Sequence, residues 1–313
     1  MIPSASSRPF INMAKPNLLL CFDAFGTLFS PKGAVAQQYA EVARQCGITE
    51  FSDNELQSRL LAAIKEEREQ NPNYGKATGL GATKWWTNVI HKTFTPLIRS
   101  DQALPPALVP KLMHRFSSRE GYDAQCDLVP ALRALRHDKS RLGFDKVVIG
   151  VVTNSDDRVP SILSSFGLNV SPARYGSEDQ MDANPEDRYD IDFHCMSYDV
   201  GVEKPDTRIF NAAELMLSRI IAARHGKAPA EADLQSWQKV YVGDEYAKDV
   251  VGSTDAGWNP VLLDVAGTST QVTSLEDCPP QALQELFKQH AVVRVRSIRG
   301  LASWLTGMEW ETK

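Results

Sequence analysis

Asp23 is the residue whose type and position most clearly suggest chemistry. It is a single carboxylate at the end of the apolar run 18–22, and a Gly-Thr turn follows at residues 26 and 27. An apolar run closed by an acid and a glycine is typical of a buried strand in a parallel sheet. Ligands bind open α/β sheets beyond the carboxyl ends of the strands. Asp23 is therefore placed where a carboxylate can act as a nucleophile.

Three later apolar runs, 147–152, 193–197 and 240–242, lead to polar residues in the same way. The polar residues that follow these runs are Thr153 and Asn154, then Lys204, and finally Asp244, Glu245 and Asp249. Parallel strands bring their carboxyl ends to one edge of a sheet. The four segments together supply a nucleophile, a hydroxyl group, a cation and a cluster of carboxylates.

Converging carboxylates predict a bound divalent cation. Two like charges about 4 Å apart repel by about 4 kcal/mol at an effective dielectric constant near 20. Asp23, Asp244, Glu245 and Asp249 offer only oxygen ligands, and such ligands select magnesium. The alternative is structural: Asp244 and Asp249 can begin and cap a helix, Thr153 can be a helix N-cap, and Lys204 can be a surface lysine.

The pattern of the remaining elements predicts an α/β fold, a doubly wound parallel Rossmann-like sheet with an inserted helical cap domain. Residues 14–31 and 123–313 would form the Rossmann-like core, residues 32–122 the helical cap, and residues 1–13 a disordered tail. Within the core we expect helices at 129–136, 159–166, 206–223 and 248–256, and late strands at 261–265 and 292–297. Lys204 and Pro205 should end a loop, with Asp206 opening the next helix.

Helical periodicity dominates the predicted insertion. Val35, Tyr39, Val42 and Cys46 share one helical face, and the sequence 52–55 is a capping box for a second helix. Further helices are expected around residues 86–94 and 108–116. Tyr74, Lys76, Trp85 and Trp86 are candidates for a substrate pocket, although the two tryptophans suit packing between the insertion and the core equally well.

The four segments, in this order, resemble the four motifs of the haloacid dehalogenase superfamily, and the resemblance covers nearly the whole chain. Asn71-Pro-Asn-Tyr-Gly75 followed by Lys84-Trp-Trp86 resembles the subfamily named haloacid dehalogenase-like hydrolase domain-containing protein three. Most members of the superfamily hydrolyse phosphate esters through an aspartyl-phosphate. The helical insertion lies where the superfamily places one type of cap, which closes over the site and excludes water.

This resemblance implies a role for each site residue. Asp23 would be the nucleophile, and Thr153, Asn154 and Lys204 would bind the phosphate group, with Lys204 also orienting Asp23. The magnesium ligands would be the side chains of Asp23 and Asp244 and the backbone carbonyl of Phe25, with Asp249 supporting the coordinated waters. The expected activity is a Mg²⁺-dependent phosphatase acting on a small phosphorylated metabolite.

Phe25 departs from the family pattern. Phosphatases of the superfamily carry an aspartate at this position as the general acid and base, and such a group is typically worth 10² to 10⁴ in rate. An aromatic residue here is also found in the first motif of 2-haloacid dehalogenases, which use no metal. Dehalogenase-type displacement without metal, and a ligand-binding or partner-binding protein with weakened catalysis, therefore remain as alternatives.

Composition limits the other classes of function. The chain has 313 residues, 42% of them hydrophobic, a formal net charge of -5 and five scattered cysteines, so neither a disulfide framework nor a zinc site is indicated. Residues 177–192 hold seven acids and one arginine, and we expect a solvated loop there and another at 226–233.

The chain offers no run of roughly 20 apolar residues and no secretory signal, which predicts an intracellular protein of the cytoplasm or nucleus. Only a weak resemblance to a mitochondrial presequence is present at residues 1–13. Nucleic-acid and membrane partners are not expected, and no oligomeric state is predicted.

Overall fold

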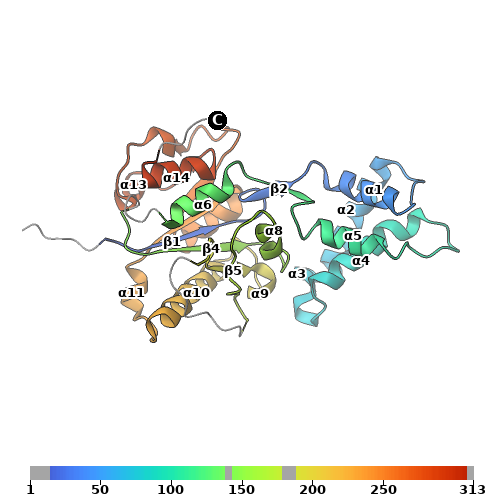
Figure 1. The fold of residues 1–313 in the computed structure, drawn as a ribbon, viewed down its shortest axis with the longest axis horizontal. Coiled ribbons are helices and arrows are strands. Elements are labelled where there is room, and N and C mark those ends of the chain that lie inside the picture. The colour runs from blue at the N-terminus through green and yellow to red at the C-terminus, as the bar shows by residue number, and fades with distance from the viewer. Residues whose placement is uncertain (1–14, 138–142, 178–187, 309–313) are drawn as a thin grey trace, which may run out of the picture.

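The computed structural model describes residues 15–137, 143–177 and 188–308. Its centre is a seven-stranded sheet with the order β5-β4-β1-β6-β7-β9-β8, in which all paired strands are parallel (Figure 1). The strands are β1 (Leu18–Phe22), β4 (Val147–Thr153), β5 (Phe193–Met196), β6 (Gln238–Gly243), β7 (Asn259–Leu263), β8 (Thr273–Ser274) and β9 (Val293–Val295).

The register brings the predicted site residues to one edge of this sheet. Phe22, the last residue of β1, pairs with Val151 of β4 on one side and with Val242 of β6 on the other. The chain leaves all three strands within two residues of these pairs, which places Asp23, Thr153 and Asp244 next to one another. The predicted convergence of the strand ends is confirmed.

Helices cover both faces of the sheet, as a doubly wound fold requires. Leu18, Leu20 and Phe22 pack with residues of α6 and α14, while Leu19 and Cys21 pack with residues of α10 on the opposite face. All five residues of β1 are buried, which explains their uninterrupted apolar character. The helices around the sheet are α6 (Leu128–His137), α8 (Val159–Ser165), α9 (Ser197–Val200), α10 (Arg208–His225), α11 (Glu231–Gln235), α12 (Val251–Asp255), α13 (Leu283–Gln289) and α14 (Ile298–Thr306).

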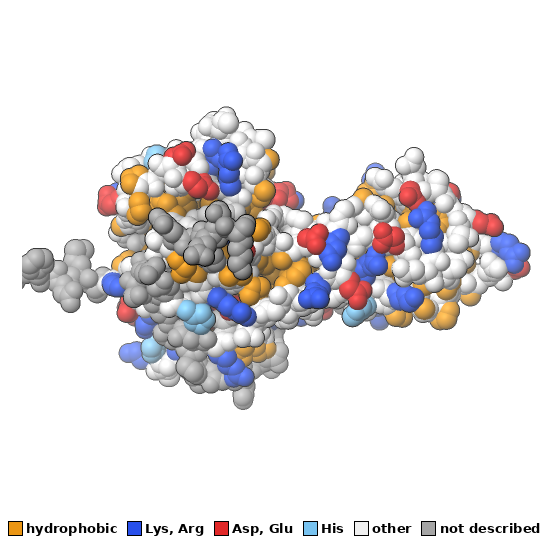
Figure 2. Space-filling view, turned by 45° about the horizontal axis from the view of Figure 1, so that its top comes forward, with side chains coloured by type: hydrophobic (Ala, Val, Ile, Leu, Met, Phe, Trp, Pro, Cys, Tyr) orange, Lys and Arg blue, Asp and Glu red, His pale blue; other side chains and the backbone are white. Residues whose placement is uncertain are grey.

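A helical lobe lies beside the sheet and is inserted between β2 (Phe29–Pro31) and β3 (Tyr122–Ala124), which pair antiparallel at its base (Figures 1 and 2). Ser52 accepts a hydrogen bond from the backbone N–H of Glu55, so the predicted helix cap is confirmed. The lobe contains α1 (Val35–Gln45), α2 (Asp53–Gln70), α3 (Pro72–Gly75), α4 (Ala82–Phe94) and α5 (Leu108–Arg115), with short 3-10 turns at Lys76–Thr78 and Thr95–Leu97. The domain boundaries given above remain a prediction.

The acidic segment 177–192 is not wholly a solvated loop, and that expectation is wrong at its C-terminal end. Asp190 and Asp192 are buried, Asp192 contacts Arg136 and Arg224, and Asp190 contacts Arg133. Buried carboxylates need such cationic partners, and the partners come from helices distant in sequence. Residues 178–187 lie outside the described residues, as does the tail 1–13.

Smaller corrections concern helix boundaries. α10 begins at Arg208 rather than at Asp206, and its N-cap is Thr207, whose side chain forms no capping hydrogen bond; the side chain of Asp206 accepts a hydrogen bond from the Arg208 N–H just before the helix. The segment expected to be a helix at 248–256 starts as a π-helical turn at Tyr246–Val250 (η3) before α12. The predicted loop 226–233 is exposed but contains the start of α11. None of the helices in the described ranges is both long and apolar enough to span a bilayer.

Candidate active site

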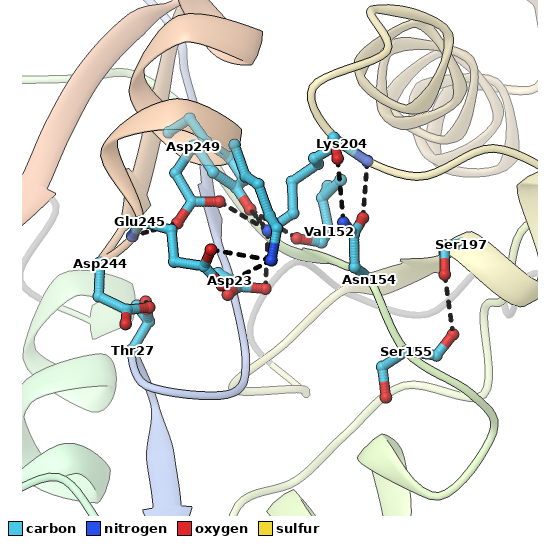
Figure 3. A network of polar contacts seen from close by, with 12 residues as sticks. Asp23, Thr27, Val152, Asn154, Ser155, Ser197, Lys204, Asp244, Glu245 and Asp249 are labelled. Carbon is cyan, nitrogen blue, oxygen red and sulfur yellow. Dashed lines mark hydrogen bonds and ion pairs between the residues drawn. The ribbon is translucent and has the colours of Figure 1, made fainter. Parts of the chain in front are cut away.

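Lys204 occupies the centre of the site at the carboxyl edge of the sheet (Figure 3). Its Nζ lies 2.8 Å from Asp23 Oδ1 and donates hydrogen bonds to Asp249 Oδ1 at 2.7 Å and to the Tyr241 hydroxyl at 2.8 Å. The lysine side chain is buried, which disfavours its charge, but the two carboxylates raise its pKa above the ordinary value. Lys204 is therefore a fixed cation that holds the predicted nucleophile, and it is not the surface lysine of the structural alternative.

Asp249 points inward from the π-helical turn that follows β6. Its Oδ2 accepts a hydrogen bond from the Glu245 N–H at 2.8 Å, so both oxygens are engaged. Burial raises the pKa of Asp249 to about 6, with Lys204 opposing this effect and Asp23 adding to it. Gly243 makes the inward position possible, because a Cβ atom there would lie 2.3 Å from Cγ of Asp249.

Asp244 faces the turn after β1. Its Oδ1 accepts a hydrogen bond from the Thr27 hydroxyl at 3.0 Å, and burial together with the charges of Asp23 and Glu245 raises its pKa. Gly26 adopts a φ of +84°, and a Cβ atom there would lie 2.3 Å from Asp244 Oδ2. The Gly-Thr turn thus contributes to the site in two ways, because the glycine leaves room for the Asp244 carboxylate and the threonine orients it.

The three aspartates fit a hard divalent cation. Each of Asp23, Asp244 and Asp249 offers one oxygen, and these oxygens all lie within 4.8 Å of one another. The three carboxylates and Lys204 sum to a formal charge of about -2 when all are ionised. A divalent cation would neutralise this charge, and oxygen donors of this kind suit Mg²⁺. Glu245 differs from the others because its side chain turns outward and pairs with Lys248.

Asn154 contacts the backbone of the lysine loop. Its side-chain Nδ2 donates to the carbonyl of Lys204 at 3.1 Å, and its Oδ1 accepts from the N–H of Lys204 at 2.7 Å. The amide thus fixes the backbone of the lysine loop and keeps a second N–H on Nδ2, and its predicted contact with a phosphate group stays a prediction. Thr153 ends β4 beside Asp23, is buried, and forms no side-chain hydrogen bond with the described residues, so its hydroxyl remains available to a ligand.

Tyr241 is a residue of the site that sequence reasoning missed. It is fully buried in β6, accepts from Lys204, and donates to the carbonyl of Val152 at 2.6 Å. Burial raises the pKa of Tyr241 well above its ordinary value, so the hydroxyl keeps the proton that it donates. A signal was present in the sequence: a tyrosine between Val240 and Val242 puts a hydroxyl group inside an otherwise apolar strand.

A cavity of about 650 Å³ opens beside this cluster and extends beneath the helical lobe. It borders Phe25, Asn154 and Lys248, and its far walls come from α1, α2, α3 and α4. The ring of Phe25 lies 4.7 Å from that of Phe29 and 5.6 Å from that of Tyr122. Phe25 is therefore part of an aromatic wall, and its position offers no group that can exchange a proton.

The tryptophan pair combines both predicted roles, packing and lining the cavity. Trp85 is buried and its Nε1 donates to the carbonyl of Asn71, whereas Trp86 donates to Asp156 at 3.0 Å. Both rings line the cavity, as does Tyr74. Lys76 lies outside the cavity wall and over the ring of Tyr198.

Comparison with known proteins decides the family. The family model for haloacid dehalogenase-like hydrolases matches residues 18–222. The chain belongs to this family of hydrolases. The haloacid dehalogenase-like hydrolase domain-containing protein 3 of Danio rerio is 29% identical over 88% of this chain and 95% of its own length, and that of Bos taurus is 28% identical over 84% and 87%. The resemblance inferred from the motifs is thereby confirmed.

The fold of this hydrolase has solved counterparts. A 2-haloacid dehalogenase from Pseudomonas syringae pv. Tomato superposes with a TM-score of 0.51 over 92% of this chain and 97% of that one, at 18% identity. An identity this low establishes a shared fold alone. It supports the Rossmann-like α/β class and does not distinguish a phosphatase from a dehalogenase.

Proposed function

We propose that this hydrolase is a Mg²⁺-dependent phosphatase that cleaves a small phosphorylated metabolite through an aspartyl-phosphate on Asp23. The observation that carries the proposal is the cluster of three carboxylates around Lys204, with its net charge of about -2. Displacement of a halide by a single aspartate needs no such excess of acids, whereas binding of a divalent cation does.

Asp23, Asp244 and the backbone carbonyl of Phe25 would hold the cation, with Asp249 fixed behind them by Lys204 and the Glu245 N–H. A bound Mg²⁺ would neutralise part of the charge on the transferring group and so favour its transfer.

The protein's own side chains would perform the other steps of the reaction. Asp23 attacks phosphorus, the bond to the leaving oxygen breaks, and water then hydrolyses the aspartyl-phosphate to release phosphate. Lys204 keeps Asp23 oriented and supplies positive charge, and the unpartnered hydroxyl of Thr153 donates to a phosphoryl oxygen. Asn154 acts indirectly, because its amide fixes the backbone of Lys204.

The leaving group receives no proton from the position of Phe25. Alkoxide leaving groups need protonation far more than phenolates or carboxylates do. We therefore propose substrates with a good leaving group, such as aryl or acyl phosphates. The helical lobe would act as a cap that covers the cavity during the reaction.

The second candidate is dehalogenase-type displacement by Asp23, which the phenylalanine at position 25 favours. The two functions predict opposite metal requirements. Purified protein should release phosphate from phenyl phosphate in the presence of Mg²⁺, and chelation should abolish this activity. Halide release from a 2-haloacid that survives chelation, without phosphatase activity, would favour the second candidate.

A further inference from the structure

The wall of the cavity includes an arginine that the proposed chemistry does not use. Arg158 lies in the loop between β4 and α8, its side chain is 12% exposed, and it borders the cavity. Its Nε and Nη2 each donate to Asp156 at 2.8 Å, and its guanidinium lies 4.4 Å from the centre of the Trp86 ring. Nη1 donates to none of the described residues.

Asp156 does not compete for this free edge. The carboxylate is completely buried and accepts from the backbone N–H and the side chain of Arg158 and from Trp86. These donors hold the acid on one side of the guanidinium. A fork geometry fixed in this way presents the remaining N–H groups of Nη1 in a defined direction.

Three tyrosines line the same cavity. The hydroxyls of Tyr39, Tyr74 and Tyr122 form no hydrogen bond with the described residues, and they remain accessible from the cavity although Tyr39 and Tyr122 as a whole are only 3% and 4% exposed. Burial raises the pKa of Tyr122 to about 12 and those of Tyr39 and Tyr74 still further, while the charge of Arg158 acts on all three in the opposite direction. The hydroxyls therefore keep their protons and can donate, and all lie within the field of Arg158.

Unpartnered donors that line a cavity are available to a bound ligand. One arginine and three tyrosines line this space, together with the apolar residues Phe25, Leu60, Ile64 and Trp85 and the charged residues Arg68, Glu203 and Lys248. The space is far larger than a phosphate group, and its volume lies in the range of pockets for small organic ligands. The arrangement suits an apolar or aromatic body that ends in an acceptor group.

We propose that Arg158, Tyr74 and Tyr122 bind a carboxylate at the non-reacting end of the substrate, which makes the substrate class phosphorylated, largely apolar carboxylic acids. A single negative charge on the ligand matches the one free edge of the guanidinium, because Asp156 already balances part of the arginine's charge. The neutral tyrosine hydroxyls would donate hydrogen bonds to the remaining lone pairs of the ligand carboxylate. The substrate assignment rests on the proposed phosphatase function, whereas the carboxylate site is testable by binding alone.

Binding is measured first, by calorimetry with benzoate and with its neutral analogue benzamide. Wild-type protein should bind benzoate at least tenfold more tightly. Arg158→Lys, which keeps the charge but loses the fork, and the double variant Tyr74→Phe/Tyr122→Phe should each reduce this preference at least fivefold. The tyrosine variant should fold normally because the lost hydroxyls have no partner in the protein, and Tyr198→Phe, outside the cavity wall, should retain the preference.

Hydrolysis is then compared for 4-carboxyphenyl phosphate and 4-carbamoylphenyl phosphate. The ratio of their kcat/KM values should favour the carboxylate in the wild type and fall at least fivefold in the double tyrosine variant, whatever the intrinsic reactivity of the two esters. Equal binding of benzoate and benzamide, or an unchanged preference in a folded double variant, overturns the carboxylate site. Selective benzoate binding without hydrolysis of either ester supports the site and overturns the phosphatase function instead.

Discussion

Neutralising Asp244 should separate the stability of the metal-free protein from its response to Mg²⁺. Asn at this position keeps an oxygen that can accept from Thr27, so the turn after β1 has its partner. It removes one negative charge and one anionic ligand. We expect Asp244→Asn to be more stable than the wild type without metal, and insensitive to Mg²⁺.

The distances set the size of both effects. At 4.8 Å, the limit within which the three carboxylate oxygens lie, each like-charged pair repels by about 3.5 kcal/mol at an effective dielectric constant near 20. Asp244 takes part in two of the three pairs, and after its attraction to Lys204 and solvent screening are deducted we expect a gain of about 1 to 3 kcal/mol. Mg²⁺ at 100 times its dissociation constant should stabilise the wild type by about 2.7 kcal/mol. For a chain of 313 residues, whose unfolding entropy is about 0.66 kcal/mol/K, such a change corresponds to about 4 °C in Tm.

The assay is thermal unfolding with and without 5 mM Mg²⁺. Glu245→Gln is the matched control, because Glu245 is adjacent in sequence but its side chain pairs outward with Lys248. The control should respond to Mg²⁺ as the wild type does. A wild-type Tm that does not change with Mg²⁺, or an equal loss of the response in both variants, would refute the assignment of the metal site.

Four further outcomes are expected. Asp23→Asn should fold and lose turnover on any confirmed substrate, because an amide cannot attack as a carboxylate does; retained activity would show that Asp23 is not the nucleophile. Phe25→Asp should raise activity on alkyl phosphates more than on aryl phosphates, provided that Tm shows a folded protein; equal changes on both would contradict the missing-acid account. Gly26→Ala should reduce kcat/KM at least tenfold, since φ is +84° and the new Cβ would meet Asp244 at 2.3 Å, and wild-type kinetics would contradict this. Burial lowers the pKa of His194 to about 4, below about 6.5 in the unfolded chain, so the stability from keeping it neutral is complete above pH 6.5 and is lost as the pH falls towards 4. Urea unfolding should show wild type losing about 2 kcal/mol more than His194→Gln between pH 7 and pH 5, and parallel losses would exclude this contribution.

The sequence predicted those parts of the site that depend on where strands end. β1, β4 and β6 are apolar on both faces because helices cover both sides of the sheet, and such runs are visible without a structure. A polar residue that ends such a run must lie at the carboxyl edge. Asp23, Thr153 and Asp244 were found in this way, with Lys204 and Asp249 added from their order and spacing.

The roles of residues that contact segments distant in the sequence could not be predicted from the sequence. Asn154 and Lys204 are 50 residues apart, and only the pairing of β4 with β5 brings the amide to the lysine backbone. Asp192 looked like a member of an acidic surface segment until α6 and α10 placed Arg136 and Arg224 around it. Side-chain type predicted the chemistry available at these positions, but tertiary packing decided which partner used it.

Phe25 connects the absence of a general acid with the aromatic wall of the cavity. The residue that removes the general acid is also the near wall of the cavity, where its ring packs with Phe29 and Tyr122. Tyr122 in turn lines the same cavity as Arg158, whose charge acts on its hydroxyl group. An aspartate at position 25 would place a charge against these rings, so a chain that binds a largely apolar substrate gains from phenylalanine there. The loss of proton donation is tolerable only if the leaving group departs readily, which is why the aromatic wall and the preference for good leaving groups are expected to occur together.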